Sequence, residues 1–105
     1  MNTFENREKA LEQIYFLDSD MAFRVRSRRD RLLALWVCGL TGAADVEAYV
    51  GEIIDIRMAG ADDEGVIAKI LADLRSAGKD LDAKALRERM ETLTAGAMRD
   101  LARPL

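Results

Sequence analysis

The chain is 105 residues long, half of its residues are hydrophobic, only 6% are aromatic and one is proline, so the sequence predicts a single all-α domain with one core. Its formal net charge of −3 argues against a protein whose entire surface binds nucleic acid. Histidine is absent, and the lack of the commonest general base and the commonest transition-metal ligand excludes many classes of enzyme.

Residues 1–18 form the first predicted element, an N-terminal arm. Phe4, Leu11 and Tyr15 share one side of a helical wheel, whereas the other apolar residues of the arm are spread around it. This pattern does not suit a single face of a bundle helix. Because a helix of about 15 residues is marginal alone in water, we expect the arm to be frayed when the protein is free and to become ordered on a partner.

Four helices are expected after the arm, because favourable N-cap residues and glycine-containing breakers divide the rest of the chain. The expected N-terminal residues are Asp18, Ser19 or Asp20, then Thr41 or Asp45, then Asp62, and finally Asp82. The expected ranges are 19–39, 43–58, 62–77 and 82–102, within a bundle of residues 19–105. Short connections between the helices predict an antiparallel four-helix bundle.

The core is expected from apolar residues that recur at about 100° per residue on each helix. In chain order these are Met21, Val25, Leu32, Leu35, Trp36 and Leu40; Val46, Tyr49, Val50, Ile53 and Ile54; Val66, Ile67, Ile70, Leu74 and Ala77; and Leu86, Met90, Leu93, Ala97 and Leu101. Arg29 falls inside the first of these faces. Its guanidinium must therefore reach solvent or meet a carboxylate, because an unpaired buried charge is costly.

Five arginines lie between Arg24 and Arg31, and Asp30 is the only acid among them. Residues 1–40 carry seven basic and six acidic side chains, a net charge of +1, so the remainder carries −4. One alternative function is therefore a helical nucleic-acid-binding module that uses Arg24 to Arg31. Nucleic acid is nevertheless not expected as the partner, because these arginines do not share one helical face and aromatic residues for stacking are few.

The remaining candidate groups have structural interpretations. Trp36 is expected in the core, and Cys38 is expected to be a small buried hydrophobe because no histidine is present to activate it. The consecutive acids after Gly60 suit the start of a helix better than a calcium loop. We therefore predict no catalytic residue, no metal site, no cofactor and no enzymatic activity. A lone cysteine and the lack of a long apolar run favour a cytoplasmic protein.

The first 36 residues contain an ordered string of charged and apolar residues. It reads Thr-Phe-x-x-Arg-Glu-Lys-Ala-x-Glu from Thr3 to Glu12, then Tyr15, Asp18 and Phe23, then Arg-Arg-x-Arg-Leu-Leu-x-x-Trp from Arg28 to Trp36. This string resembles the zeta subunit family of bacterial F-type ATP synthases, small proteins that act as intrinsic inhibitors of ATP hydrolysis.

The resemblance implies a four-helix bundle with a mobile N-terminal arm that enters a catalytic interface between alpha and beta subunits, near the rotating gamma subunit, and blocks rotation in the hydrolysis direction. The partner-binding residues that the resemblance implies in the arm are Thr3, Phe4, Arg7, Glu8, Lys9, Ala10, Glu12, Tyr15 and Asp18, and the helical wheel adds Leu11 to this expected set. The residues implied to join the arm to the bundle and support docking are Phe23, Arg28, Arg29, Arg31, Leu32, Leu33 and Trp36.

This family role needs no cofactor. It places the protein in the cytoplasm, held peripherally at the inner face of the plasma membrane through the ATP synthase, without insertion into the membrane and monomeric when free. Ile14 and Leu17 stand where inhibitory members tend to carry polar residues, and they could bind the arm back onto its own bundle. A second alternative is therefore a non-inhibitory family member that acts as an assembly or structural factor.

Overall fold

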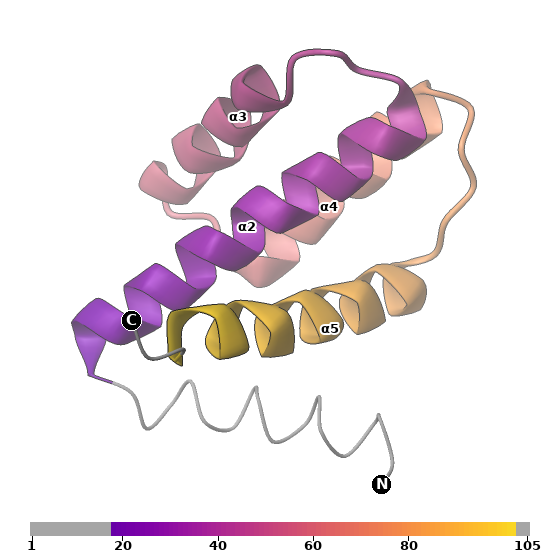
Figure 1. Ribbon diagram of the computed structural model, residues 1–105. Coiled ribbons are helices and arrows are strands. Elements are labelled where there is room, and N and C mark those ends of the chain that lie inside the picture. Colours follow the sequence, from indigo (N-terminus) through magenta and orange to yellow (C-terminus); the bar gives the residue numbers. More distant parts are fainter. Residues whose placement is uncertain (1–17, 103–105) are drawn as a thin grey trace, which may run out of the picture.

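The computed structural model describes residues 18–102, so the expected arm lies outside the described part except for Asp18. Four helices follow one another: α2 (Ser19–Thr41), α3 (Val46–Met58), α4 (Asp63–Ser76) and α5 (Ala83–Ala102). The predicted all-α four-helix bundle is confirmed for this part of the chain (Figure 1). None of these four helices is long and apolar enough to cross a membrane.

An aspartate side chain caps the start of each helix. The acceptor carboxylates and the amides that donate to them are Asp18 and Met21 (2.9 Å), Asp45 and Ala48 (3.0 Å), Asp62 and Gly65 (2.9 Å), and Asp82 and Ala85 (2.7 Å). Each carboxylate satisfies an amide that has no partner within the helix and places negative charge at the positive end of the helix dipole. Of the two predicted starts for α3, Asp45 is therefore the cap, and Thr41 is the last residue of α2.

Glycines with a positive φ, Gly42, Gly60 and Gly78, follow the ends of three of the helices. Gly42, with φ of 81°, closes α2 by donating its amide to the carbonyl of Cys38. Gly78, with φ of 75°, lets the amide of Lys79 return to the carbonyl of Leu74 at 2.9 Å. A side chain with a Cβ is strained in this conformation, so the breakers in the sequence act here through backbone geometry.

The longest helix, α2, packs against each of the other three. Figure 1 shows α3 and α5 running antiparallel to α2 on two sides of it, with α4 behind. Helices adjacent in the sequence are thus antiparallel neighbours, as short connections require.

The core is formed mainly by aliphatic side chains from all four helices. Its members include Val25, Leu33, Ala34, Val37 and Cys38 from α2; Tyr49, Val50 and Ile53 from α3; Val66, Ile67, Ile70 and Leu74 from α4; and Leu86, Met90 and Ala97 from α5. The predicted faces of α4 and α5 are correct at most positions. Ala77 is exposed, and Leu93 and Leu101 are only partly buried.

The predicted face of α2 is wrong at its centre. Leu35 is 56% exposed, and Trp36 lies at the border of the core, whereas Leu33 and Val37 are fully buried. The prediction grouped residues by helical periodicity alone. Because three helices pack against α2, the positions of those helices decide which of its side chains are buried.

Candidate functional site

A groove of about 740 Å³ lies between α2 and α3. Three large apolar side chains at this groove are exposed: Phe23 by 66%, Ile54 by 50% and Met58 by 83%. The other lining residues are Arg26, Ser27, Arg28, Asp30, Arg31, Val50, Ile53 and Arg57. A cluster of exposed apolar side chains surrounded by polar ones is typical of a binding surface. We call this feature the α2–α3 groove.

The lining of the groove is apolar because α3 carries apolar side chains on more than one face. Ile53 is 1% exposed and belongs to the core, whereas Ile54 is rotated by about 100° and faces the groove. The prediction that Ile54 is a core residue is therefore wrong. Met58 ends α3, one residue before the C-cap Ala59, and extends the apolar surface to the end of the helix.

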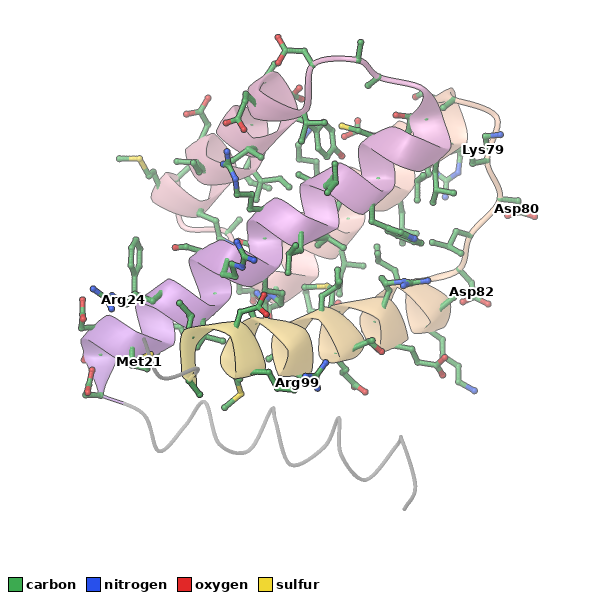
Figure 2. All side chains as sticks on the ribbon, in the orientation of Figure 1. Met21, Arg24, Lys79, Asp80, Asp82 and Arg99 are labelled. Carbon is green, nitrogen blue, oxygen red and sulfur yellow. The ribbon has the colours of Figure 1, made fainter. Side chains whose placement is uncertain are left out.

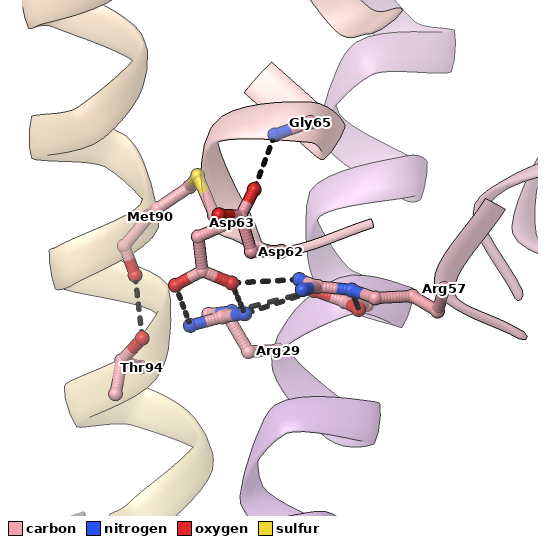
Figure 3. Close-up of polar contacts among 8 residues, drawn as sticks. Arg29, Arg57, Asp62, Asp63, Gly65, Met90 and Thr94 are labelled. Carbon is pink, nitrogen blue, oxygen red and sulfur yellow. Dashed lines mark hydrogen bonds and ion pairs between the residues drawn. The ribbon is translucent and has the colours of Figure 1, made fainter. Parts of the chain in front are cut away.

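Beneath the groove, two arginines and two aspartates form a network of ion pairs, which we call the Arg29 network. Arg29 is 2% exposed. Its Nη2 atom lies 2.8 Å from Oδ1 of Asp63 and 3.2 Å from Oδ1 of Asp30. Arg57 bonds to the same two carboxylates, with Nε 3.0 Å from Oδ2 of Asp30 and Nη2 2.8 Å from Oδ1 of Asp63. In Figure 3, dashed lines join the carboxylate of Asp63 to both guanidinium groups.

The Arg29 network joins three helices around a buried charge. Arg29 and Asp30 belong to α2, Arg57 to the last turn of α3, and Asp63 to the first turn of α4. Two positive and two negative charges balance, and planar guanidinium groups can hold two carboxylates at once. Of the two outcomes that the sequence left open for Arg29, pairing with a carboxylate is confirmed.

The network also sets the acid sensitivity of Asp63. Its partial burial alone would raise the pKa, but the charge of Arg29 and the hydrogen bonds from Arg57 and Arg29 hold the pKa of this carboxyl below its ordinary value of 3.8. The folded chain therefore releases this proton more readily than the unfolded chain. The resulting stabilisation is present above about pH 4 and is lost as the pH falls through the lowered pKa of the folded state.

We therefore expect the free energy of unfolding to fall more steeply below about pH 4 in the natural chain than in an Asp63→Asn variant. Asparagine keeps a similar shape but does not titrate. Urea denaturation of both chains at a series of pH values, followed by circular dichroism, measures this difference. Parallel pH profiles of the two chains would show that Asp63 is not responsible for the loss of unfolding free energy at low pH.

The arginines of the Arg24 to Arg31 cluster have different surroundings. Arg28 pairs with Asp100 of α5 at 2.9 Å, Arg31 with Glu47 of α3, and Arg24 with Asp20 at 3.5 Å. Arg26 is exposed and forms no ion pair with residues 18–102. Since carboxylates neutralise most of these arginines and Arg29 is buried, the cluster is a poor track for phosphates, which disfavours the nucleic-acid alternative.

The residues predicted to support docking fall into two groups. Phe23, Arg28 and Arg31 line the α2–α3 groove, where a partner can reach them. Arg29 and Leu33 are buried, and Leu32 and Trp36 are partly buried. Arg89 of α5 lies over the ring of Trp36, 4.9 Å from its centroid. Residues of this second group hold α2 in the bundle, so any effect of theirs on docking acts through the fold.

Sequence reasoning missed the contribution of α3 to this surface. Ile54, Arg57 and Met58 were not predicted as binding residues, and they form one wall of the groove. A signal was present, because the apolar residues of α3 from Val46 to Met58 cover more of the helix circumference than one core face needs.

A second polar cluster joins α3 to α4. The hydroxyl of Tyr49 donates to Asp73 at 2.6 Å, and the ammonium of Lys69 bonds to Asp73 at 3.0 Å and to Glu52 at 2.8 Å. Burial and the hydrogen bond to Asp73 raise the pKa of Tyr49, so this hydroxyl stays protonated at neutral pH. These contacts act as cross-links between two helices.

The groups considered for chemistry are in the core or already paired. Cys38 is buried, and burial raises the pKa of its thiol, which keeps it in the less reactive protonated form. Among the residues that the structure describes, no group of three or more His, Cys, Asp or Glu side chains is placed to hold a metal ion. The α2–α3 groove is thus the best candidate site on residues 18–102, and it is a surface for binding.

One comparison with known proteins identifies a family. The family model for ATPase inhibitor subunit zeta matches residues 1–100, from the N-terminal residues into the last turn of α5. A search of curated proteins gave no match.

Proposed function

The chain belongs to the ATPase inhibitor subunit zeta family, and we propose that it binds the catalytic sector of a bacterial F-type ATP synthase and inhibits ATP hydrolysis. The observation that carries this proposal is the family match over residues 1–100. The family is one of inhibitor subunits, which also supports a role without enzymatic activity of its own.

In the proposed mechanism, the arm enters a catalytic interface between alpha and beta subunits and meets the gamma subunit. It blocks rotation in the hydrolysis direction by occupying space that the moving subunits need. The proposed contacts are Thr3, Phe4, Arg7, Glu8, Lys9, Ala10, Leu11, Glu12 and Tyr15. An amphipathic segment of this kind can place its apolar stripe in a groove while its charged residues pair at the rim.

The arm should bind through a few dominant anchors. Ordering a flexible segment on a partner costs about 2–5 kcal/mol, so the remaining affinity must come from well-buried apolar side chains. Phe4, Leu11 and Tyr15 are the proposed anchors. Asp18 has a separate task, since its carboxylate caps α2 and fixes the point at which the arm joins the bundle.

We place the protein in the cytoplasm, held at the inner face of the plasma membrane by the ATP synthase. In this arrangement the bundle stays outside the catalytic interface and keeps α2 rigid. A rigid α2 defines the position from which the arm extends, and the exposed Phe23 and Arg31 are available for supporting contacts.

The test is to add the purified chain to the cognate F-type ATPase. We expect the rate of ATP hydrolysis to fall to a low residual value as the protein concentration rises, and we expect the chain to co-purify with the ATPase. Absence of both binding and inhibition would refute the proposal. Binding without inhibition would instead select an assembly or structural role.

A further inference from the structure

An occupant that matches the α2–α3 groove has two chemical properties. The exposed side chains of Phe23, Ile54 and Met58 require apolar partners. Arg26 is exposed at the groove and has no ion pair with any described residue, so it favours a carboxylate. The matching occupant is an amphipathic segment with acidic residues beside its apolar stripe.

The N-terminal residues of the same chain have this pattern. Phe4, Leu11 and Tyr15 fall on one stripe of a helical wheel. Three acids, Glu5, Glu8 and Glu12, repeat at intervals of three and four residues, which places them together along one flank of that stripe. The basic residue Arg7 falls on the other flank.

The connection to α2 is short enough to bring this segment to the groove. Asp18 has an extended backbone, with ψ of 165°, and Phe23 lies only five residues further along. Figure 2 shows Met21 and Arg24 at the end of α2 where the chain continues into residues 1–17, far from Lys79 and Asp80. A helical hairpin needs a loop of only about two to five residues.

The length of the N-terminal segment also matches the length of the groove. As a helix, residues 4–15 would extend over about 18 Å, which exceeds the roughly 12 Å between Phe23 and Arg31 along α2. A short tether raises the effective concentration of a segment at its own groove to about the millimolar range. A free competitor at lower concentration must therefore bind more tightly to displace it.

In place of an arm that is frayed in the free protein, we propose that residues 1–17 bind in the α2–α3 groove of the same molecule when the protein is free. Phe4, Leu11 and Tyr15 then cover the exposed apolar surface of the groove, and the acidic flank lies toward Arg26. Ile14 lies beside the apolar stripe on the helical wheel and adds apolar area to it.

The consequence for regulation rests on the proposed function. The arm must leave the groove before it can enter the catalytic interface, so the apparent affinity for the ATP synthase is reduced by the fraction of molecules whose arm is bound. Substitutions that weaken the binding of the arm in the groove should therefore strengthen inhibition. Substitutions in a surface that docks on the ATP synthase would weaken inhibition. The two possibilities differ in the sign of the effect.

The first test uses the full chain without the ATP synthase. In a double variant, Ile54→Gln and Met58→Gln, the groove loses apolar surface without any change of charge or of helix propensity large enough to unfold α3. We expect trypsin to cleave after Arg7 and Lys9 several-fold faster in this variant than in the natural chain. Equal cleavage rates would overturn the proposal.

The matched control is Leu35→Gln, which removes another half-exposed apolar side chain of α2 that does not line the groove. Its cleavage rate should equal that of the natural chain, and circular dichroism should show all three chains folded. Protection should also be independent of protein concentration. Protection that falls on dilution would show that the groove holds the arm of a second copy, which would overturn the proposal as stated.

The second test measures inhibition by the same three chains. We expect the groove variant to inhibit ATP hydrolysis at a several-fold lower concentration than the natural chain and the Leu35→Gln control. A higher required concentration would mean that the groove docks on the ATP synthase, against the proposal. If none of the chains inhibits, the proposed function fails, and the cleavage rates still decide whether the arm binds the groove.

Discussion

A chain that begins at Asp18 is expected to lose inhibition of ATP hydrolysis completely while keeping its helical bundle. All three proposed anchors, Phe4, Leu11 and Tyr15, are removed. Since one dominant anchor is worth about 2 kcal/mol or more, and 1.4 kcal/mol corresponds to a factor of about ten in affinity, the combined loss should exceed the measurable range. Titration of the ATPase with the shortened chain measures the effect.

Retaining Asp18 matters for this experiment. The Asp18 carboxylate accepts a hydrogen bond of 2.9 Å from the backbone amide of Met21. Loss of such a cap lowers the unfolding free energy by about 1 kcal/mol. With the cap in place, the helical circular dichroism of residues 18–102 should be unchanged, because their four helices pack together around a core of their own side chains. Inhibition by the shortened chain would show that the bundle carries the activity.

Single substitutions refine the same prediction. Phe4→Ala and Tyr15→Ala should each raise the half-inhibitory concentration by about ten-fold or more. Lys79→Ala is the control, because Lys79 lies in the exposed connection between α4 and α5, at the other end of α2 from the arm (Figure 2). Equal effects of the three substitutions would argue against specific anchors.

The largest loss of stability is expected from Arg29→Ala. The side chain is 2% exposed, so alanine removes core packing as well as the ion pairs to Asp30 and Asp63. Removing one member of a buried ionic network leaves the other charges short of partners, and we expect a decrease in unfolding free energy of about 2–4 kcal/mol. Since Arg57 still contacts both carboxylates, the loss should stay below that of a fully isolated charge.

Arg28→Ala provides the comparison for this prediction. Arg28 is the preceding residue and also forms an ion pair, with Asp100, but its side chain is 45% exposed. A pair at the surface contributes less than about 1 kcal/mol. Urea denaturation of the two variants should therefore give clearly different midpoints. A similar midpoint for both would show that burial of Arg29 adds little to stability.

Local signals in the sequence predicted the elements of the bundle well. Asp62 and Asp82 were identified as caps because capping depends on residues within one turn. Likewise, Gly42 and Gly78 end helices through their own backbone geometry. The resemblance of the N-terminal string to the zeta family agrees with the family match over residues 1–100.

The sequence could not predict features that depend on contacts between helices. Leu35 and Leu33 are similar side chains two positions apart, and only the placement of the neighbouring helices decides which one is buried. The partner of Arg29, Asp63, lies 34 residues away. The groove requires α2 and α3 together, so neither helix alone indicates it. Residues 3–15, which carry the proposed inhibitory contacts, lie outside the described residues.

Asp30 and Arg57 belong to two features of this molecule at once. Both line the α2–α3 groove, and both complete the Arg29 network that holds the first turn of α4. Whatever occupies the groove therefore touches side chains whose other hydrogen bonds maintain the tertiary structure. Thermal stability and groove occupancy are thermodynamically linked through these two residues, so a ligand of the groove will shift the melting temperature by an amount that depends on whether it preserves the pairing of Asp63.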